Sequence, residues 1–224
     1  ADQTWQPAAR SGVRQEDARP YRLTPERVRH TIQMLGEPWP VGKWKETGEL
    51  KLLNNQSVDH IAKWLHDNPT ALIRVTVKRT DKAMEPLINF GANISRNAKQ
   101  GRWLAAPEIL RILPWCDVQL HRGYIGEEMA IGFQWLERVG ISLDLDRVTM
   151  RSGAWSFGLV MESLWKAMTR PPQNEMMGPA AAFLRSSDRA RLFPMANEMY
   201  QRGYTVMGYG SGGVHLSITD DTDR

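Results

Sequence analysis

Cations and an aromatic side chain are concentrated between residues 74 and 102, the stretch best suited to bind a phosphate backbone. Seven basic residues against two acidic ones give it a local net charge of +5. Guanidinium and ammonium groups donate charge-assisted hydrogen bonds to phosphate, and an indole ring offers a flat surface for a base. We predict a nucleic-acid contact here, and a solvated helix end is the alternative reading. The predicted contact residues are Arg79, Lys82, Arg96, Lys99, Arg102 and Trp103.

A second basic cluster, near residue 190, is offset only by Asp188. Ser186 or Ser187 is expected to cap a helix there, and the first amides of a helix favour an anion. An ordinary capped helix with exposed arginines is the alternative. The predicted contacts in this cluster are Arg185, Arg189 and Arg191.

Two further patterns resemble ligand sites but fail on their context. Residues 208–213 match the glycine spacing of a dinucleotide-binding loop, which needs a following helix, whereas residues 214–218 alternate like a strand. We therefore predict a hairpin turn. Asp144 and Asp146 would lie on one face of a strand, but no third carboxylate is near them in sequence. We predict no metal site.

No residue pattern indicates catalysis. His60 and His66 are six apart on an expected helix and so point about 120° away from each other. Cys116 is the only cysteine, which excludes an internal disulfide, and its apolar surroundings predict a small buried side chain. We therefore expect no cofactor and favour a protein that is not an enzyme, although sites built from distant residues leave no such pattern.

The nine tryptophans divide by their surroundings. Trp64, Trp135 and Trp165 lie on or beside apolar helix faces and are predicted to be core. Trp5 and Trp103 lie in polar, basic surroundings and are predicted to be exposed. Trp39 and Trp44 fall in a stretch with Pro38, Pro40 and Gly42 that predicts a loop.

Apolar spacing and capping residues predict several helices. Thr24 and Pro25 open the first, with Val28, Ile32 and Leu35 on one face, and Ser57 caps the second, with Ile61, Trp64 and Leu65 inward. Further helices are predicted after Met84, over residues 107–113 and 156–168, and as two short helices within 178–202. The strongest is predicted over 125–139, where Met129, Phe133 and Leu136 form a stripe expected to be the most buried in the fold.

Strands are predicted at residues 71–78, 116–121 and 142–150, with a hairpin over 204–218. The expected fold is α+β, predominantly helical, with a few short strands and a C-terminal hairpin. We expect an extended arm over residues 1–22, which show no apolar period, a single globular domain over 23–219 and an acidic tail over 220–224. No apolar run is long enough to span a membrane, so no membrane insertion is expected.

The formal net charge of +4, with 21 arginines among 29 basic residues, favours an anionic partner. The leading hypothesis is a non-enzymatic RNA- or single-strand-binding subunit of coat or nucleocapsid type. It would pair with copies of itself through the N-terminal arm. The alternatives are an assembly subunit of a bacterial envelope or secretion machine, and an enzyme with an unrecognised site. Virion or cytoplasm would follow from the first hypothesis and periplasm from the second; the sequence does not choose between them.

Overall fold

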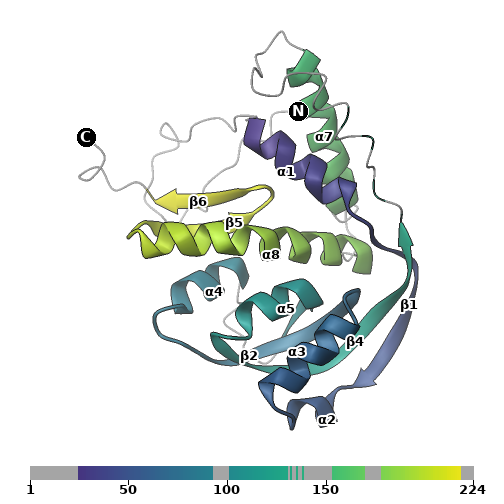
Figure 1. The fold of residues 1–224 in the computed structure, drawn as a ribbon, viewed down its shortest axis with the longest axis vertical. Helices are drawn as coiled ribbons and strands as arrows, with labels where there is room; N and C mark the ends of the chain where they lie inside the picture. Colours follow the sequence, from purple (N-terminus) through teal and green to yellow (C-terminus); the bar gives the residue numbers. More distant parts are fainter. Residues whose placement is uncertain are drawn as a thin grey trace.

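The computed structural model describes residues 25–92, 101–130, 132, 135, 138, 153–169 and 178–217. These residues form seven helices and six strands in two antiparallel sheets, a mixed α+β fold (Figure 1). About half of the structure is helical and about a third is strand. The predicted predominance of helices over a few short strands is therefore wrong, because two strands are 11 and 15 residues long.

The larger sheet has the order β1-β4-β2-β3, with every neighbouring pair antiparallel. Its strands are β1 (Trp39–Glu49), β2 (Ala71–Thr80), β3 (Arg102–Ala105) and β4 (Cys116–Ala130). The smaller sheet is a hairpin of β5 (Thr205–Gly210) and β6 (Gly213–Ser217). The helices are α1 (Pro25–Gly36), α2 (Lys51–Asn54), α3 (Val58–Asp67), α4 (Glu85–Ala92), α5 (Ala106–Ile112), α7 (Gly153–Thr169) and α8 (Pro179–Gln201).

The helix predicted over residues 125–139 is wrong as far as Ala130, because these residues complete β4. β1 supplies a partner over the whole segment, from Arg122 opposite Glu49 to Ala130 opposite Trp39. Gly126 permits this close pairing, since a Cβ at that position would lie 2.4 Å from Pro40 Cβ. Met129 is 47% exposed, so the expected burial of this stripe fails there; Phe133 and Leu136 lie outside the described side chains.

The loop predicted around Trp39 and Trp44 is also wrong, because both belong to edge strand β1. Proline lacks a ladder donor but is tolerated on an edge strand, and Pro40 lies there. Gly42 adopts a φ of +67° next to a register shift between Val41 and Trp44. Such irregularities let the strand bend while it stays paired with β4.

Asn54 extends the hydrogen-bonding of β4 beyond the end of β1. Its side-chain amide accepts from the Leu120 N–H at 2.7 Å and donates to the Leu120 carbonyl at 2.6 Å. The backbone N–H of Leu50 donates to the His121 carbonyl at 2.9 Å. The short helix α2 thus satisfies backbone groups that β1 no longer reaches.

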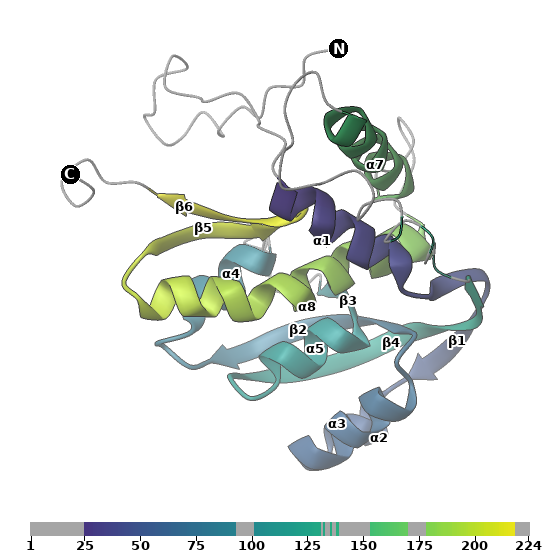
Figure 2. The ribbon, with the colours of Figure 1, turned by 45° about the horizontal axis from the view of Figure 1, so that its top comes forward.

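Helix α8 links two apolar cores. Leu184 belongs to a core formed with α1, α7 and Trp39 of β1. Leu192, Phe193 and Ala196 belong to the main core, formed with α3, α4, α5 and one face of the large sheet. Figures 1 and 2 show α8 running between the β5–β6 hairpin and helices α4 and α5.

The two short helices predicted within residues 178–202 are in fact this single helix of 23 residues. Pro194 lies inside it, although an internal proline removes one helical hydrogen bond and costs about 3 kcal/mol. The buried neighbours on both sides of the proline explain why the helix continues, because apolar burial outweighs the lost bond.

Several predictions are confirmed. α1 buries Val28, Ile32 and Leu35. Ser57 caps α3 by accepting the His60 N–H. The strand at 71–78, the short helix at 107–113 and the helix at 156–168 correspond to β2, α5 and α7. The predicted arm over residues 1–22, the strand at 142–150 and the acidic tail lie outside the described residues.

Candidate nucleic-acid interface

The alternation of β2 gives the large sheet two unlike faces. Ile73, Val75 and Val77 belong to or pack against the main core, under helices α3, α4, α5 and α8. Successive side chains of a strand point to opposite faces, so Arg74 and Thr76 lie on the other face. Lys78 lies at a register shift between Val77 and Arg79, near the end of the strand. We call the second side the open face, because within the described residues the helices of the main core pack with the side chains of the first.

Two aromatic rings meet across β2 on the open face. Trp103 of β3 and Tyr124 of β4 stack with their centroids 5.5 Å apart and an interplanar angle of 30°. Their strands are separated by two strand intervals, about 10 Å, so the rings lean toward each other over β2. Leu72 lies opposite Tyr124 in the register and is only 2% exposed although it belongs to neither core. The ring pair therefore forms a small apolar platform above Leu72.

Polar and basic groups continue the open face along β2. The Thr76 hydroxyl and the His121 imidazole form a hydrogen bond of 2.9 Å through Oγ1 and Nε2. Gly101 passes close by with a φ of +58°, and a Cβ there would lie 3.2 Å from Arg74 Cγ and from Thr76 Oγ1. Lys78 is exposed beyond them. The face thus combines a stacked aromatic pair with two cations farther along β2, Arg74 and, near the end of the strand, Lys78.

Negative charge lies toward the other edge of the same sheet. Glu46 of β1 is opposite Tyr124 in the register, and Glu128 of β4 is opposite Val41. Both carboxylate side chains are exposed. An anionic strand is therefore expected to run on the β2 side of the aromatic pair, along Arg74 and Lys78, and to avoid the β1 edge.

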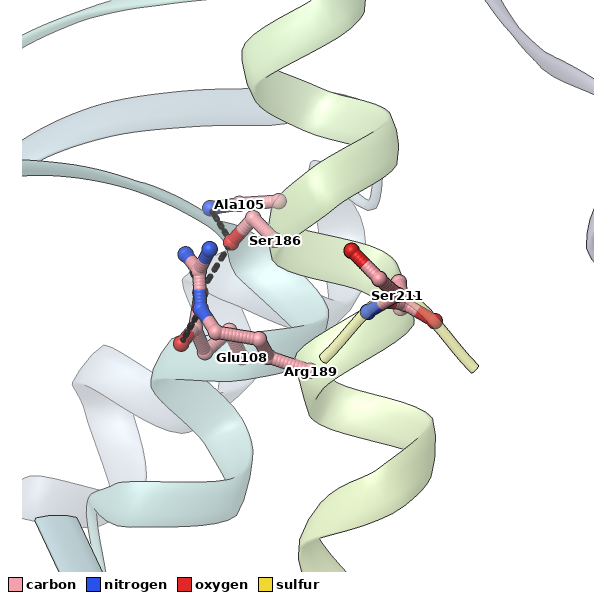
Figure 3. A network of polar contacts seen from close by, with 6 residues as sticks. Ala105, Glu108, Ser186, Arg189 and Ser211 are labelled. Carbon is pink, nitrogen blue, oxygen red and sulfur yellow. Dashed lines mark hydrogen bonds and ion pairs between the residues drawn. The ribbon is translucent and has the colours of Figure 1, made fainter. Parts of the chain in front are cut away.

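Arg102 precedes Trp103 but belongs to an internal network on the helix side of the sheet. Arg189 of α8 donates to both oxygens of Glu108 on α5, through Nε at 2.7 Å and Nη2 at 2.6 Å. The Ser186 hydroxyl donates to Glu108 Oε2 and accepts the Ala105 N–H at 2.6 Å. Figure 3 shows Glu108, Ser186 and Arg189 together on one side of α8, with Ser211 on the other.

The charges in this network are only partly compensated. Burial and the nearby Arg189 lower the pKa of Arg102 to about 10, and its Nη1 is buried without a hydrogen-bond partner among the described residues. Burial opposes the charge of Arg189, but Glu108 outweighs it and raises the pKa of that guanidinium. Burial, followed by the charge of Glu108, raises the pKa of Tyr209 well above its usual range. Glu108 is therefore the anion that binds the half-buried Arg189, and its charge also favours the charged form of the half-buried Arg102.

The glycine-rich turn binds a carboxylate of the protein itself. Asp188, whose side chain is 2% exposed, accepts the Ser211 N–H at 2.5 Å and the Gly212 N–H at 3.3 Å. It is also 2.6 Å from His30 Nε2 on α1. Ser211 and Gly212 have φ angles of +52° and +78°, so their successive amides form a concave anion site. The turn joins β5 and β6, as predicted. Its anion site is occupied by the carboxylate of Asp188 from α8.

The prediction that Ser186 or Ser187 caps a helix is wrong, because both lie in the middle of α8, whose N-cap is Gly178. The arginines around them therefore do not surround a helix N-terminus. Arg185 is half-buried. Arg191 forms an ion pair with Glu37, and burial lowers its pKa.

The residues predicted between 74 and 102 separate in the structure. Arg79 and Lys82 are exposed at and beyond the end of β2, Trp103 lies on the open face, and Arg102 is internal. Arg96 and Lys99 lie outside the described residues. Tyr124 was not among the predicted contact residues, because a helix was predicted to begin at the next residue. The alternation of β2 was the signal for Arg74, since it separates this side chain from those of Ile73 and Val75.

Other predicted features have mixed outcomes. Cys116 is 8% exposed, and burial followed by the charge of Asp117 raises its pKa to about 12, as suits a buried, unreactive thiol. Trp165 is buried and Trp64 packs against the main core, but the prediction that Trp135 is core is wrong, because it is 57% exposed. Trp103 is 36% exposed. Trp5 lies outside the described residues.

In the part of the chain that the structure describes, no group of three or more His, Cys, Asp or Glu side chains is arranged to hold a metal ion. None of the described helices combines the length and the apolarity needed to cross a bilayer. Comparisons with protein-family models, curated proteins and solved structures found no match to this chain.

Proposed function

We propose that the protein binds single-stranded nucleic acid on the open face of its large sheet. The observation that carries the proposal is the stacked Trp103–Tyr124 pair, on a face that within the described residues is not covered by the core helices. A four-stranded sheet with aromatic side chains on one face is a known way to stack unpaired bases. The bases would extend the ring stack, and the exposed indole of Trp103 would supply the first surface.

The charges beside the platform support a backbone contact. Arg74 and Lys78 follow the ring pair along β2, and Arg79 is exposed at the end of the same strand. Guanidinium and ammonium groups bind phosphate without reading sequence. Stacking is also tolerant of base identity because every base has a flat face. The proposed binding is therefore weakly selective for sequence and selective for single strands over duplexes, whose bases are already stacked.

The test is fluorescence anisotropy with a labelled ten-nucleotide oligouridylate at low salt, against the same length of duplex. Base–aromatic stacking is worth about 1–3 kcal/mol per base. Trp103→Ala should therefore weaken binding by about fivefold to a hundredfold, since 1.4 kcal/mol is a factor of about ten. Tyr124→Ala should also weaken binding because it removes the ring that supports the indole.

Trp115 provides a matched control. It is 38% exposed, close to the 36% of Trp103, and lies in the turn between α5 and β4. Trp115→Ala should leave the dissociation constant unchanged. Failure of the parent protein to bind the oligouridylate, or an equal loss in Trp115→Ala, would refute the proposal. Circular dichroism of each variant excludes unfolding as the cause of lost binding.

A further inference from the structure

A second site outside the open face lies between α1, α8 and the residues that follow β4. There the surface is hollowed to a volume of about 760 Å³, lined by the last turns of α1, by Arg191 of α8, and by Trp135 and Arg138. Small-molecule sites commonly enclose about 300–1,000 Å³. The hollow therefore has room for a ligand of nucleotide size.

Its wall contains an aromatic ring and a cation. Trp135 and Arg138 both line the hollow, and both have a helical backbone conformation. Trp135 is the most exposed tryptophan among the described residues, at 57%. This exposed indole lines the same hollow as two arginines and offers a flat surface on which a base can stack.

The facing wall adds a paired cation and an acceptor. Arg191 and Glu37 form an ion pair, and their side chains remain 32% and 60% exposed. With Arg138, the described charged groups of the hollow are two guanidiniums and one carboxylate, a net charge of +1. An anionic group is therefore favoured, and Glu37 retains an oxygen that can accept a hydrogen bond from a hydroxyl or amino group.

Close backbone packing positions this wall. A Cβ at Gly132 would lie 2.0 Å from the Gly36 carbonyl oxygen, so only glycine permits the chain to pass so near the end of α1. Gly132 is buried there. The contact holds the start of the segment that carries Trp135 and Arg138 against α1.

We infer that this hollow binds a nucleoside phosphate, with the base stacked on Trp135 and the phosphate held by Arg138 and Arg191. The inference stands independently of binding on the open face, because it uses none of the same residues. The same chemistry is present in a free nucleotide and in the 5′-phosphorylated end of an oligonucleotide, and the experiment separates the two.

Isothermal titration of the full chain with AMP, with adenosine and with a 5′-phosphorylated or 5′-hydroxyl oligoadenylate tests the inference. AMP should bind at least about tenfold more tightly than adenosine, the factor expected for a charge-assisted contact. Arg138→Ala should remove most of that difference, and Trp135→Ala should weaken AMP and adenosine alike. Trp135→Phe should restore much of the affinity. Tighter binding of the phosphorylated oligonucleotide than of AMP would identify a strand end as the ligand.

Two control variants and one outcome of the titration decide the result. Arg111→Ala removes an exposed arginine of α5 that is not in the hollow and should leave AMP binding unchanged. Trp103→Ala should also leave it unchanged; if it abolishes AMP binding while Trp135→Ala does not, the nucleotide binds on the open face and the hollow is refuted. No AMP binding at millimolar concentration, or equal affinity for AMP and adenosine, refutes the inference whatever the oligouridylate result.

Discussion

Arg102 and Trp103 are adjacent in β3 but lie on opposite faces of the large sheet. On the two faces the basic side chains differ in whether a carboxylate neutralises them. On the helix side, Arg102 and Arg189 share one carboxylate, Glu108, which is bound to Arg189 and Ser186. On the open face, Lys78 is exposed and the aromatic pair lies above a single buried leucine. The arginines on the first side support the fold, whereas Lys78, near the end of β2, is exposed. Exposure and pairing, rather than residue type, separate the two roles.

The largest expected effect is loss of the shared carboxylate. Glu108→Gln keeps the shape of the side chain but removes the buried anion bound to the half-buried Arg189, and breaking a buried pair costs about 3–5 kcal/mol. The free energy of unfolding, measured by urea denaturation, should fall by that amount. Glu198→Gln removes the partner of Arg202 in an exposed pair and should cost about 0–1 kcal/mol. Equal costs for the two variants would show that the helix side is not electrostatically distinct.

A smaller loss is expected on the opposite side of α8. Asp188→Asn removes the charge that binds the Ser211 and Gly212 amides and His30. A buried hydrogen-bond group left partly unsatisfied costs about 1–3 kcal/mol. The same denaturation experiment should report this value, with hydrogen exchange of the Ser211 amide accelerated more than that of the β2 amides. Unchanged exchange at the turn would mean that the carboxylate does not hold the hairpin.

The open face is tested by its salt dependence. If Lys78 contacts phosphate, Lys78→Ala should reduce the slope of log affinity against log salt by about 0.7, the value for one phosphate on a single strand. Fold stability should stay unchanged because Lys78 is exposed. Lys63→Ala, an exposed change on α3, is the matched control and should leave the slope unchanged. Equal slopes in all three proteins would remove Lys78 from the interface.

The smallest effect concerns the thiol at the start of β4. Burial raises the pKa of Cys116 from its ordinary value of 9.0 to about 12, so the native thiol keeps its proton between these pH values while the unfolded thiol loses it. The group therefore contributes stability below about pH 9 that is lost progressively up to about pH 12. At pH 8, iodoacetamide should label native Cys116 far more slowly than the urea-unfolded chain. Equal rates would show that the site is open.

Local sequence patterns were sufficient to predict secondary structure where the residues of a segment determine its conformation without distant partners. Ser57 has the side chain that accepts an N–H in the first turn of α3, and Val28, Ile32 and Leu35 repeat at the period of a helix. The alternation of β2 likewise assigned Ile73 and Val75 to one face. In these segments, hydrogen bonding and apolar period agree over a few residues, so no distant partner is needed to decide them.

The tertiary structure decided what depended on distant partners. Residues 125–130 carry helix-like apolar spacing, yet β1 pairs with them, with one register shift, from Lys45 opposite Ile125 to Trp39 opposite Ala130. Two short helices were predicted within residues 178–202, but burial on both sides of Pro194 keeps α8 continuous. The roles of Arg102 and Arg189 also followed from packing, because only the fold brings Glu108 within hydrogen-bond distance of α8. Sequence alone determined that the chain is rich in arginine and tryptophan; three-dimensional contacts determined which of these side chains stay accessible, since pairing and burial involve residues far apart in the chain.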